Sequence, residues 1–141
     1  MAAFNKFNQF VEDIAKGFHD LSSHTLKVAL TNSAPVATNT VLANITQLGA
    51  GNGYSTGGNT ATLVSAVQTS GTFKLVLADV NFTASGGTIG PFQYFVLYND
   101  SQTSPVKPLI GWWDYGSAIS IADGNTHTLD LSATNGVLQL A

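Results

Sequence analysis

Side chains that could hold a metal ion are few in this sequence and are widely spaced. Its three histidines are His19, His24 and His127, and Glu12 is its only glutamate. A metal site needs several ligands that converge from fixed positions, and ligands on one helix face stand three or four residues apart. His19 and His24 are separated by five positions, and no glutamate lies near them. The pattern therefore predicts no metal site.

The glycine-rich segment Gly49–Gly58 is the second candidate for chemistry. Its second half, Gly53–Gly58, has the glycine spacing of a phosphate-binding loop, but Asn59 stands where such a loop carries its lysine, and a strand pattern follows. We therefore expect a long, flexible structural loop. The aspartates that are candidates for a pair of catalytic carboxylates, namely Asp114, Asp123 and Asp130, lie near expected turns, where aspartate is favoured for its hydrogen bonds to the backbone. We expect no catalytic residue, no cofactor and no enzymatic activity.

Composition excludes several further classes of function. Charged residues make up 9% of the chain, against about 25% in ordinary domains, and the formal net charge is −3. Nucleic-acid binding needs clustered cations, which five lysines and no arginine do not supply. No apolar run approaches the roughly 18 residues of a membrane helix. The low charge fits either a protein packed in an assembly or a merely hydrophilic β domain.

The first 21 residues carry a helical period. The apolar residues recur every three or four positions, which predicts an N-terminal amphipathic helix over residues 1–21 that lies on a sheet or against a partner chain. The stripe consists of Phe4, Phe7, Val11, Ile14, Phe18 and Leu21.

From residue 25 to residue 141 the pattern is that of strands separated by turns. Alternation in Thr25–Thr31 predicts a half-buried strand, and Phe92–Tyr98 is apolar on both faces, which predicts a central strand covered on both sides. Further strands are expected at 60–68, 72–79, 109–115, 117–122, 126–132 and 137–140, with a hairpin turn at Asp123–Asn125 and one or two helical turns between Val41 and Leu48. The prediction is one mainly β domain, an antiparallel β-sandwich or jelly-roll-like barrel of about eight strands.

Adjacent aromatic residues mark the segment Trp112-Trp113-Asp114-Tyr115. Neighbouring residues in a strand face opposite sides, so one tryptophan is expected in the core and the other outward. The outward ring could stack on a sugar, or it could be covered by the N-terminal helix or by a neighbouring subunit.

Four segments resemble a family of small virion proteins of tailed bacteriophages: Ala3–Asp13, Thr25–Val36, Ala50–Tyr54 and Gly111–Gly116. The resemblance extends to Asn135–Leu140 and so covers nearly the whole chain. The shared residues are packing and turn residues, so the resemblance implies an origin in a phage particle more strongly than a role within it. Proteins of this kind look like capsid decoration, or cement, proteins, and some are tail proteins.

The resemblance and the composition together lead to one expectation about function. We expect a non-enzymatic capsid decoration protein on the outer surface of the virion, assembled in the host cytoplasm, that bridges major capsid subunits as a homo-oligomer such as a trimer. Neither nucleic acid nor a membrane is an expected partner. The alternatives are a tail tube, tip or adaptor protein and a carbohydrate-binding module. The residues expected to contact a partner are Phe4, Phe7, Phe10, Val11, Trp112, Trp113 and Tyr115.

Overall fold

The computed structural model describes residues 4–141, and in that part the chain is mainly β with antiparallel pairing throughout. This confirms the predicted fold class, a mainly β, sandwich-like architecture. The strands are β1 Phe4–Lys6, β2 Leu26–Thr31, β3 Asn59–Ala61, β4 Leu63–Thr69, β5 Thr72–Leu77, β6 Val80–Thr83, β7 Ile89–Asn99, β8 Leu109–Ile121, β9 Thr126–Leu129 and β10 Leu138–Leu140. The helical elements are α1, Asn8–Ala15, and the short 3-10 helix η1, Leu42–Asn44.

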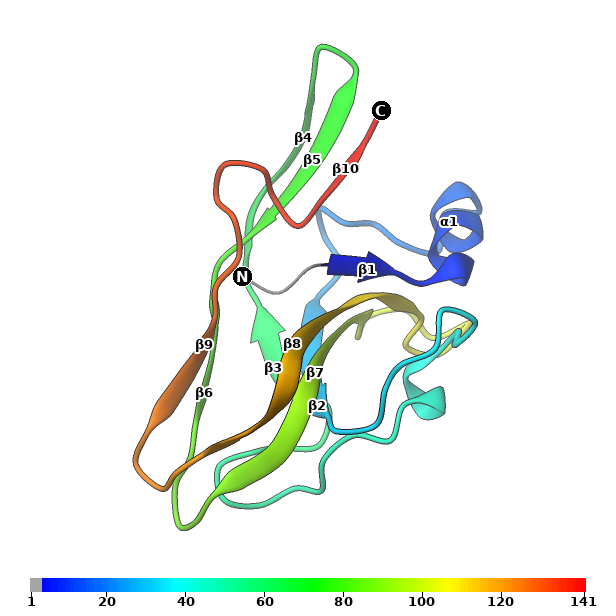
Figure 1. Cartoon of the computed structure of the whole chain (residues 1–141). Coiled ribbons are helices and arrows are strands. Elements are labelled where there is room, and N and C mark those ends of the chain that lie inside the picture. The colour runs from blue at the N-terminus through cyan, green and yellow to red at the C-terminus, as the bar shows by residue number, and fades with distance from the viewer. Residues whose placement is uncertain (1–3) are drawn as a thin grey trace.

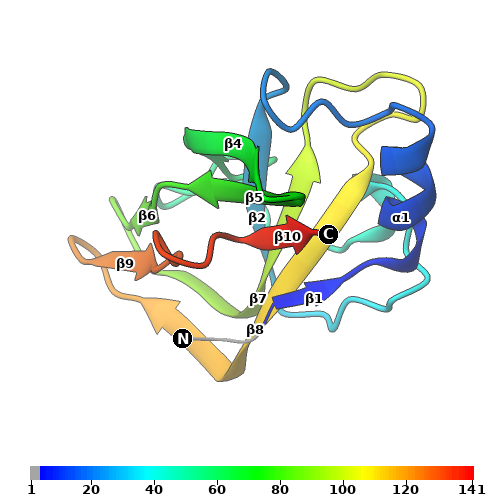
Figure 2. The same ribbon diagram turned by 90° about the horizontal axis from the view of Figure 1, so that it is seen from above.

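A five-stranded sheet in the order β1-β8-β7-β2-β3 forms the centre of the molecule. A three-stranded sheet in the order β10-β5-β4 and a two-stranded ribbon of β6 and β9 cover one of its faces, and the far end of the three-stranded sheet projects beyond the central sheet (Figures 1 and 2). The main core lies between these layers. It includes Val28, Phe95 and Trp113 from the central sheet and Leu75 and Phe82 from the covering strands.

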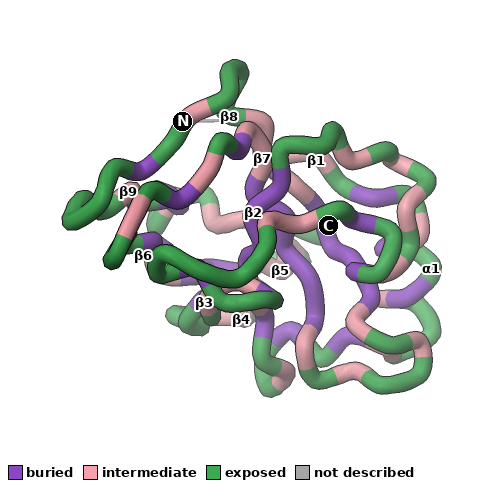
Figure 3. The backbone as a smooth tube through the Cα atoms, turned by 90° about the horizontal axis from the view of Figure 1, so that it is seen from below, coloured by how far each residue is buried: buried purple, intermediate pink, exposed green. Residues whose placement is uncertain are grey.

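The central strand β7 is buried on both faces, as its apolar sequence predicts. Phe95 and Leu97 belong to the main core, whereas Val96 and Tyr98 belong to a second cluster on the opposite face. This second cluster is covered in part by η1 and by Phe7, the residue before α1. Burial therefore follows the central strands, while β4 is mostly exposed (Figure 3).

The N-terminal helix is shorter than the period predicts. Residues 1–3 lie outside the described part, and Phe4–Lys6 form β1, in which Phe4 pairs with Trp113. Helix α1 ends at Ala15 because Gly17 adopts a φ of 80°, which lets the N–H groups of Phe18 and Gly17 donate to the carbonyls of Asp13 and Ile14.

The prediction also placed two helix residues on the wrong faces. Val11, expected on the apolar stripe, is half exposed, and Asp13, expected away from the stripe, is buried.

Strand pairing in the C-terminal third also differs from the prediction. The two strands expected at 109–115 and 117–122 are one strand, β8, and the break expected at Gly116 (φ 96°) is an irregularity in its register with β7. The turn at Asp123–Asn125 forms, but β9 pairs with β6 and not with β8. The Gly124 N–H donates to the carbonyl of Ala84, just after β6. At this turn the chain therefore crosses from the central sheet to the ribbon of β6 and β9. Likewise, β10 pairs with β5 and not with β9.

Candidate functional site

The fold brings His19 and His24 together through a residue that the sequence did not single out, Asn99 at the end of β7. The Asn99 Nδ2 atom lies 3.1 Å from His19 Nδ1 and 2.8 Å from His24 Nδ1. Its Oδ1 atom accepts hydrogen bonds from the backbone N–H groups of Ser101 and Gln102. The side-chain nitrogen of Asn99 must therefore donate one hydrogen to each histidine.

This network fixes the tautomer of His19. Because Nδ1 accepts a hydrogen bond, the proton of the neutral ring is on Nε2. His19 is 7% exposed, and within the described residues its Nε2 and the Oδ2 of Asp13 are the buried side-chain polar atoms without a hydrogen-bond partner. Burial, with a smaller effect from the charge of His24, lowers the pKa of His19 from 6.5 to about 4. At neutral pH His19 is therefore neutral and buried: its Nδ1 accepts a hydrogen bond from Asn99, and its Nε2–H has no hydrogen-bond partner.

We expect the buried His19 to make the protein less stable as the pH falls from about 6.5 to about 4. In this window the unfolded chain binds a proton that the folded chain does not, so the free energy of unfolding rises with pH and is lost on acidification. A pKa shift of this size corresponds to roughly 3 kcal/mol. Urea denaturation at a series of pH values measures it.

The matched variant for this prediction is His19→Leu, which removes the titrating ring from its buried position. The pH slope of its stability between about 6.5 and 4 should be smaller than that of the unaltered chain, whatever its absolute stability. Part of the slope should remain, because burial also lowers the pKa of His127. Parallel pH profiles of the two proteins would contradict the assignment.

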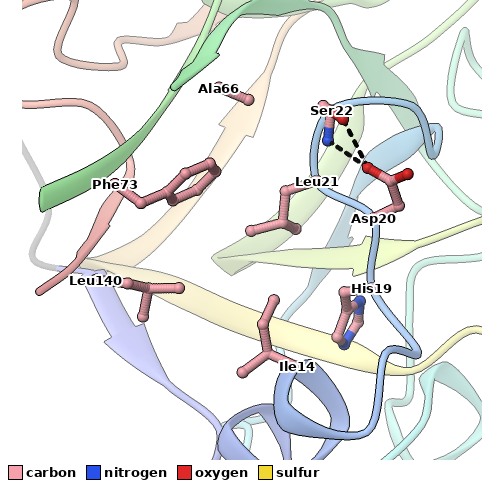
Figure 4. Close-up of a pocket in the computed structure, with 8 residues that line it drawn as sticks. All are labelled: Ile14, His19, Asp20, Leu21, Ser22, Ala66, Phe73 and Leu140. Carbon is pink, nitrogen blue, oxygen red and sulfur yellow. Dashed lines mark hydrogen bonds between the residues drawn. The ribbon is translucent and has the colours of Figure 1, made fainter. Parts of the chain in front are cut away.

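His19 lines an open, apolar groove between the segment that follows α1 and the three-stranded sheet β10-β5-β4, which we call the projecting sheet. The groove has a volume of about 470 Å³ (Figure 4). Phe73 and Leu140 of the sheet face Ile14 of α1 and Leu21 across it. At its rim the Asp20 carboxylate accepts hydrogen bonds from the Ser22 hydroxyl and backbone N–H. Together with a side-chain hydrogen bond from Ser23, these bonds lower the pKa of Asp20 to about 2. The remaining lining residues are His19 and Ala66. Such walls suit an apolar group.

Two of the three aspartates considered for acid–base chemistry, Asp114 and Asp123, accept hydrogen bonds from backbone and side-chain groups. Asp114 Oδ1 accepts hydrogen bonds from Gln93 Nε2 and from the N–H of Gly116, at 2.9 and 2.8 Å. Asp123 Oδ1 accepts from the N–H of Gly86 at 3.0 Å. No group of three His, Cys, Asp or Glu side chains that could hold a metal ion occurs in residues 4–141.

The glycine-rich loop is held at several points. The Gln47 Oε1 atom accepts hydrogen bonds from the Tyr54 hydroxyl and the Gly57 N–H, and the Tyr98 hydroxyl donates to the Gly57 carbonyl. Burial raises the pKa of both tyrosines. The expectation of a structural loop fits this arrangement, but the expected flexibility does not, because the loop is anchored to the central sheet.

The sequence reasoning overlooked one pattern in this loop. Gly53–Gly57 has the form Gly-x-Ser-x-Gly, in which the serine of a nucleophile elbow would be Ser55. Such an elbow lies between a strand and a helix, with a base within hydrogen-bond reach. Here a strand, β3, follows the loop, and no histidine or carboxylate is hydrogen-bonded to the Ser55 hydroxyl in the described residues. The pattern is therefore no nucleophile elbow in this fold.

The residues expected to contact a partner divide into buried and exposed groups. Phe7, Phe10 and Trp113 are buried in the chain's own core, so as surface contacts they were predicted wrongly. The reason is that Phe7 and Phe10 pack against the chain's own sheets, which was one of the two alternatives for the N-terminal segment, and that Trp113 is the inward member of the tryptophan pair. Val11 and Tyr115 are exposed, whereas Phe4 and Trp112 are only partly so.

The tryptophan pair does face opposite sides of β8, as predicted. Trp113 enters the main core beside Phe4, whereas Trp112 packs on Phe7 in the second cluster, with ring centres 4.6 Å apart. The outward ring, Trp112, is thus covered in part by Phe7, the residue that precedes α1. Only Tyr115 of the aromatic segment is well exposed, so the segment does not offer a platform of several rings to a sugar.

Exposed apolar side chains gather instead on the projecting sheet, which the sequence analysis did not select. Among residues 4–141, half of the eight large exposed apolar residues belong to β4 and β10, namely Leu63, Val64, Val67 and Leu140. The sequence gives little indication that these residues are exposed, because Leu63–Val67 has the pattern of an ordinary strand and its position at the edge of a sheet is not encoded locally. The projecting sheet and the adjoining groove form the candidate protein-binding site.

Comparisons with known proteins add no family to this description. No family model matches the chain, and neither a curated protein nor a solved structure matches it. In residues 4–141, no helix has the length and apolar character needed to cross a membrane.

Proposed function

We propose that this chain is a non-enzymatic structural protein of a tailed-bacteriophage virion that decorates the outer surface of the capsid. It would bind where major capsid subunits meet and act as a cement between them. The observation that carries the proposal is the projecting sheet, where exposed apolar side chains lie beside an apolar groove on a molecule with few charges. Such a surface gains free energy when another protein covers it.

The energetics favour many weak contacts over one strong one. Val64 and Val67 are 61% and 59% exposed, and complete burial of a valine is worth at most about 1.5–3 kcal/mol. A few such residues give a modest interface per copy. Repeated over hundreds of copies on a closed shell, modest interfaces across capsomer junctions would resist the outward pressure of packaged DNA.

Charge favours the outside of the shell. The chain has a net charge of −3 and no arginine, so it lacks the clustered cations that a surface facing DNA phosphates would use. The sparse charge also lowers the desolvation cost of contact with a neighbouring protein, because removing the side chains of serine, threonine and asparagine from water costs less free energy than removing ions.

Copy number in the particle tests the proposal. Quantitative mass spectrometry of purified virions, and of heads separated from tails, should find hundreds of copies per particle that remain with the heads. A small multiple of three or six that remains with the tails would replace capsid decoration by a tail role. Absence from washed particles would overturn the proposal altogether.

A further inference from the structure

The projecting sheet ends in a strand edge that is long and carries no charge. Strand β4 has seven residues, lies at the edge of its sheet and, within residues 4–141, pairs only with β5. The other outer strands are shorter: β1, β3 and β10 have three residues each, and β6 and β9 of the two-stranded ribbon have four each. Natural proteins protect exposed edges by shortness, by charge, by proline or by a bulge. In β4 the one such device is the irregularity between Leu63 and Ser65, and Ser65–Thr69 continue with regular pairing.

We propose that the β4 edge pairs with the β4 edge of a second copy of this chain, antiparallel and about a two-fold axis. This inference goes beyond capsid decoration, and it can be tested on the isolated protein without the virion. An unpaired strand edge is complementary to another strand because its free N–H and C=O groups repeat at the spacing of the partner. Identical strands that run antiparallel satisfy this requirement symmetrically, which is the commonest form of protein dimer.

The residues of β4 favour a second copy over a different partner. Leu63–Thr69 contains no charged residue, so an identical strand meets no like charge, and a charged partner finds no opposite charge. Pairing about Ala66 gives full overlap, since Leu63 of one copy then stands opposite Thr69 of the other. Val67 of each copy then stands opposite Ser65 of the other and diagonal to the other Val67, so the two exposed Val67 side chains lie on one face on either side of the axis.

The same arrangement joins the grooves of the two copies. Ala66 lines the groove and stands opposite Leu75, on the core-facing side of the projecting sheet. With Ala66 at the two-fold axis, the two grooves meet there and form one apolar trough across the dimer. The inferred assembly is a dimer rather than the trimer expected from the sequence. A strand edge is smaller than the about 800 Å² per partner of a standard interface, so we expect a dissociation constant in the micromolar range or weaker.

Single-cysteine variants give the most direct test, because the chain has no cysteine of its own. Cβ atoms directly opposite each other across an antiparallel pair are about 4.5–5.5 Å apart, close to the distance that a disulfide needs. Under mild oxidation, a scan from Val64 to Gln68 should show cross-linking to a dimer with a maximum at Ala66→Cys. Val106→Cys, on a distant exposed loop residue, is the control and should remain monomeric.

Sedimentation velocity over a range of concentrations tests the same interface without a covalent bond. The unaltered chain should show a dimer fraction that rises with concentration. Val67→Lys should raise the dissociation constant about tenfold or more, because two lysines then meet across the axis. Val106→Lys adds the same charge elsewhere and should change nothing, and circular dichroism should show both variants folded. A monomer at every concentration, or a dimer that neither Val67→Lys nor the cysteine scan detects, would overturn the inference.

Discussion

Gly58→Ala should abolish folding or cost at least about 4 kcal/mol of unfolding free energy. Gly58 precedes β3 and approaches the backbone of β2 so closely that an added Cβ atom would lie 1.8 Å from the Val28 carbonyl oxygen and 2.8 Å from the Ala29 Cα. Its φ of 77° adds the strain of a left-handed conformation, about 1–2 kcal/mol. The β2 backbone cannot retreat, because Val28 and Ala29 are fully buried and pair with β7. Urea or thermal unfolding, followed by circular dichroism, measures the loss.

Gly124→Ala is the matched control for this prediction. Gly124 has nearly the same φ, 83°, but an added Cβ atom there meets nothing within 4 Å. Its replacement should therefore cost only the backbone strain, about 1–2 kcal/mol. The difference between the two variants isolates the close approach of the loop to the central sheet. Equal losses of stability in the two variants would show that the loop can move away from β2.

The parts of this fold that depend on neighbouring residues can be predicted from the sequence, whereas the parts that depend on residues far apart in the chain cannot. The two-sided apolar run of β7 shows its central position, although the strand extends from Ile89 to Asn99, beyond the predicted Phe92–Tyr98. The alternation in β2 locates that strand, but the strand is buried on both faces and not half-buried as predicted. Pairing partners cannot be predicted in this way, because the turn at Asp123–Asn125 looks the same whether the next strand folds back on β8 or crosses to β6. The deciding hydrogen bond joins Gly124 to Ala84, 40 positions away in the sequence.

The N-terminus shows how a local period can mislead. Phe4, Phe7 and Phe10 have helical spacing, yet Phe4 gains more as part of a strand, where it pairs with Trp113 and its ring packs 4.9 Å from the tryptophan ring. The helix then begins at Asn8, and its phase buries Phe10 and Asp13 while Val11 of the predicted stripe is exposed. A pattern of apolar residues shows that they are buried, but it does not say whether their own chain or a partner buries them.

The candidate site was the least predictable part. Three elements distant in sequence build the groove: α1 with the segment His19–Ser22, the hairpin of β4 and β5, and β10. The Asn99 bridge between the two histidines likewise depends on the position of β7 beside the helix end. Exposure of Val64 and Val67 depends on β4 being an edge strand, which only the sheet order reveals. No spacing within the chain encodes these juxtapositions.

The adjacent tryptophans should differ sharply in their contribution to stability, and Trp113→Ala should cost about 3–5 kcal/mol. Trp113 is 2% exposed and lies in the main core between β8 and the covering strands, against Phe4 of β1. Truncation would leave a cavity that the neighbouring strands cannot fill, because they are held in register by the sheet. It would also remove the side chain against which β1 packs. Equilibrium unfolding in urea measures the loss.

Trp112→Ala supplies the comparison, since the two residues share a strand, a size and a chemistry. Trp112 is partly exposed and packs on Phe7 at the edge of the smaller cluster, so its loss should cost less, about 1–2 kcal/mol. Because the chain has only two tryptophans, each variant also reports the fluorescence of the other. The emission of Trp113 should lie at shorter wavelength than that of Trp112. If Trp112→Ala were the more damaging change, then Trp112 and not Trp113 would be the side chain that anchors β8 in the core.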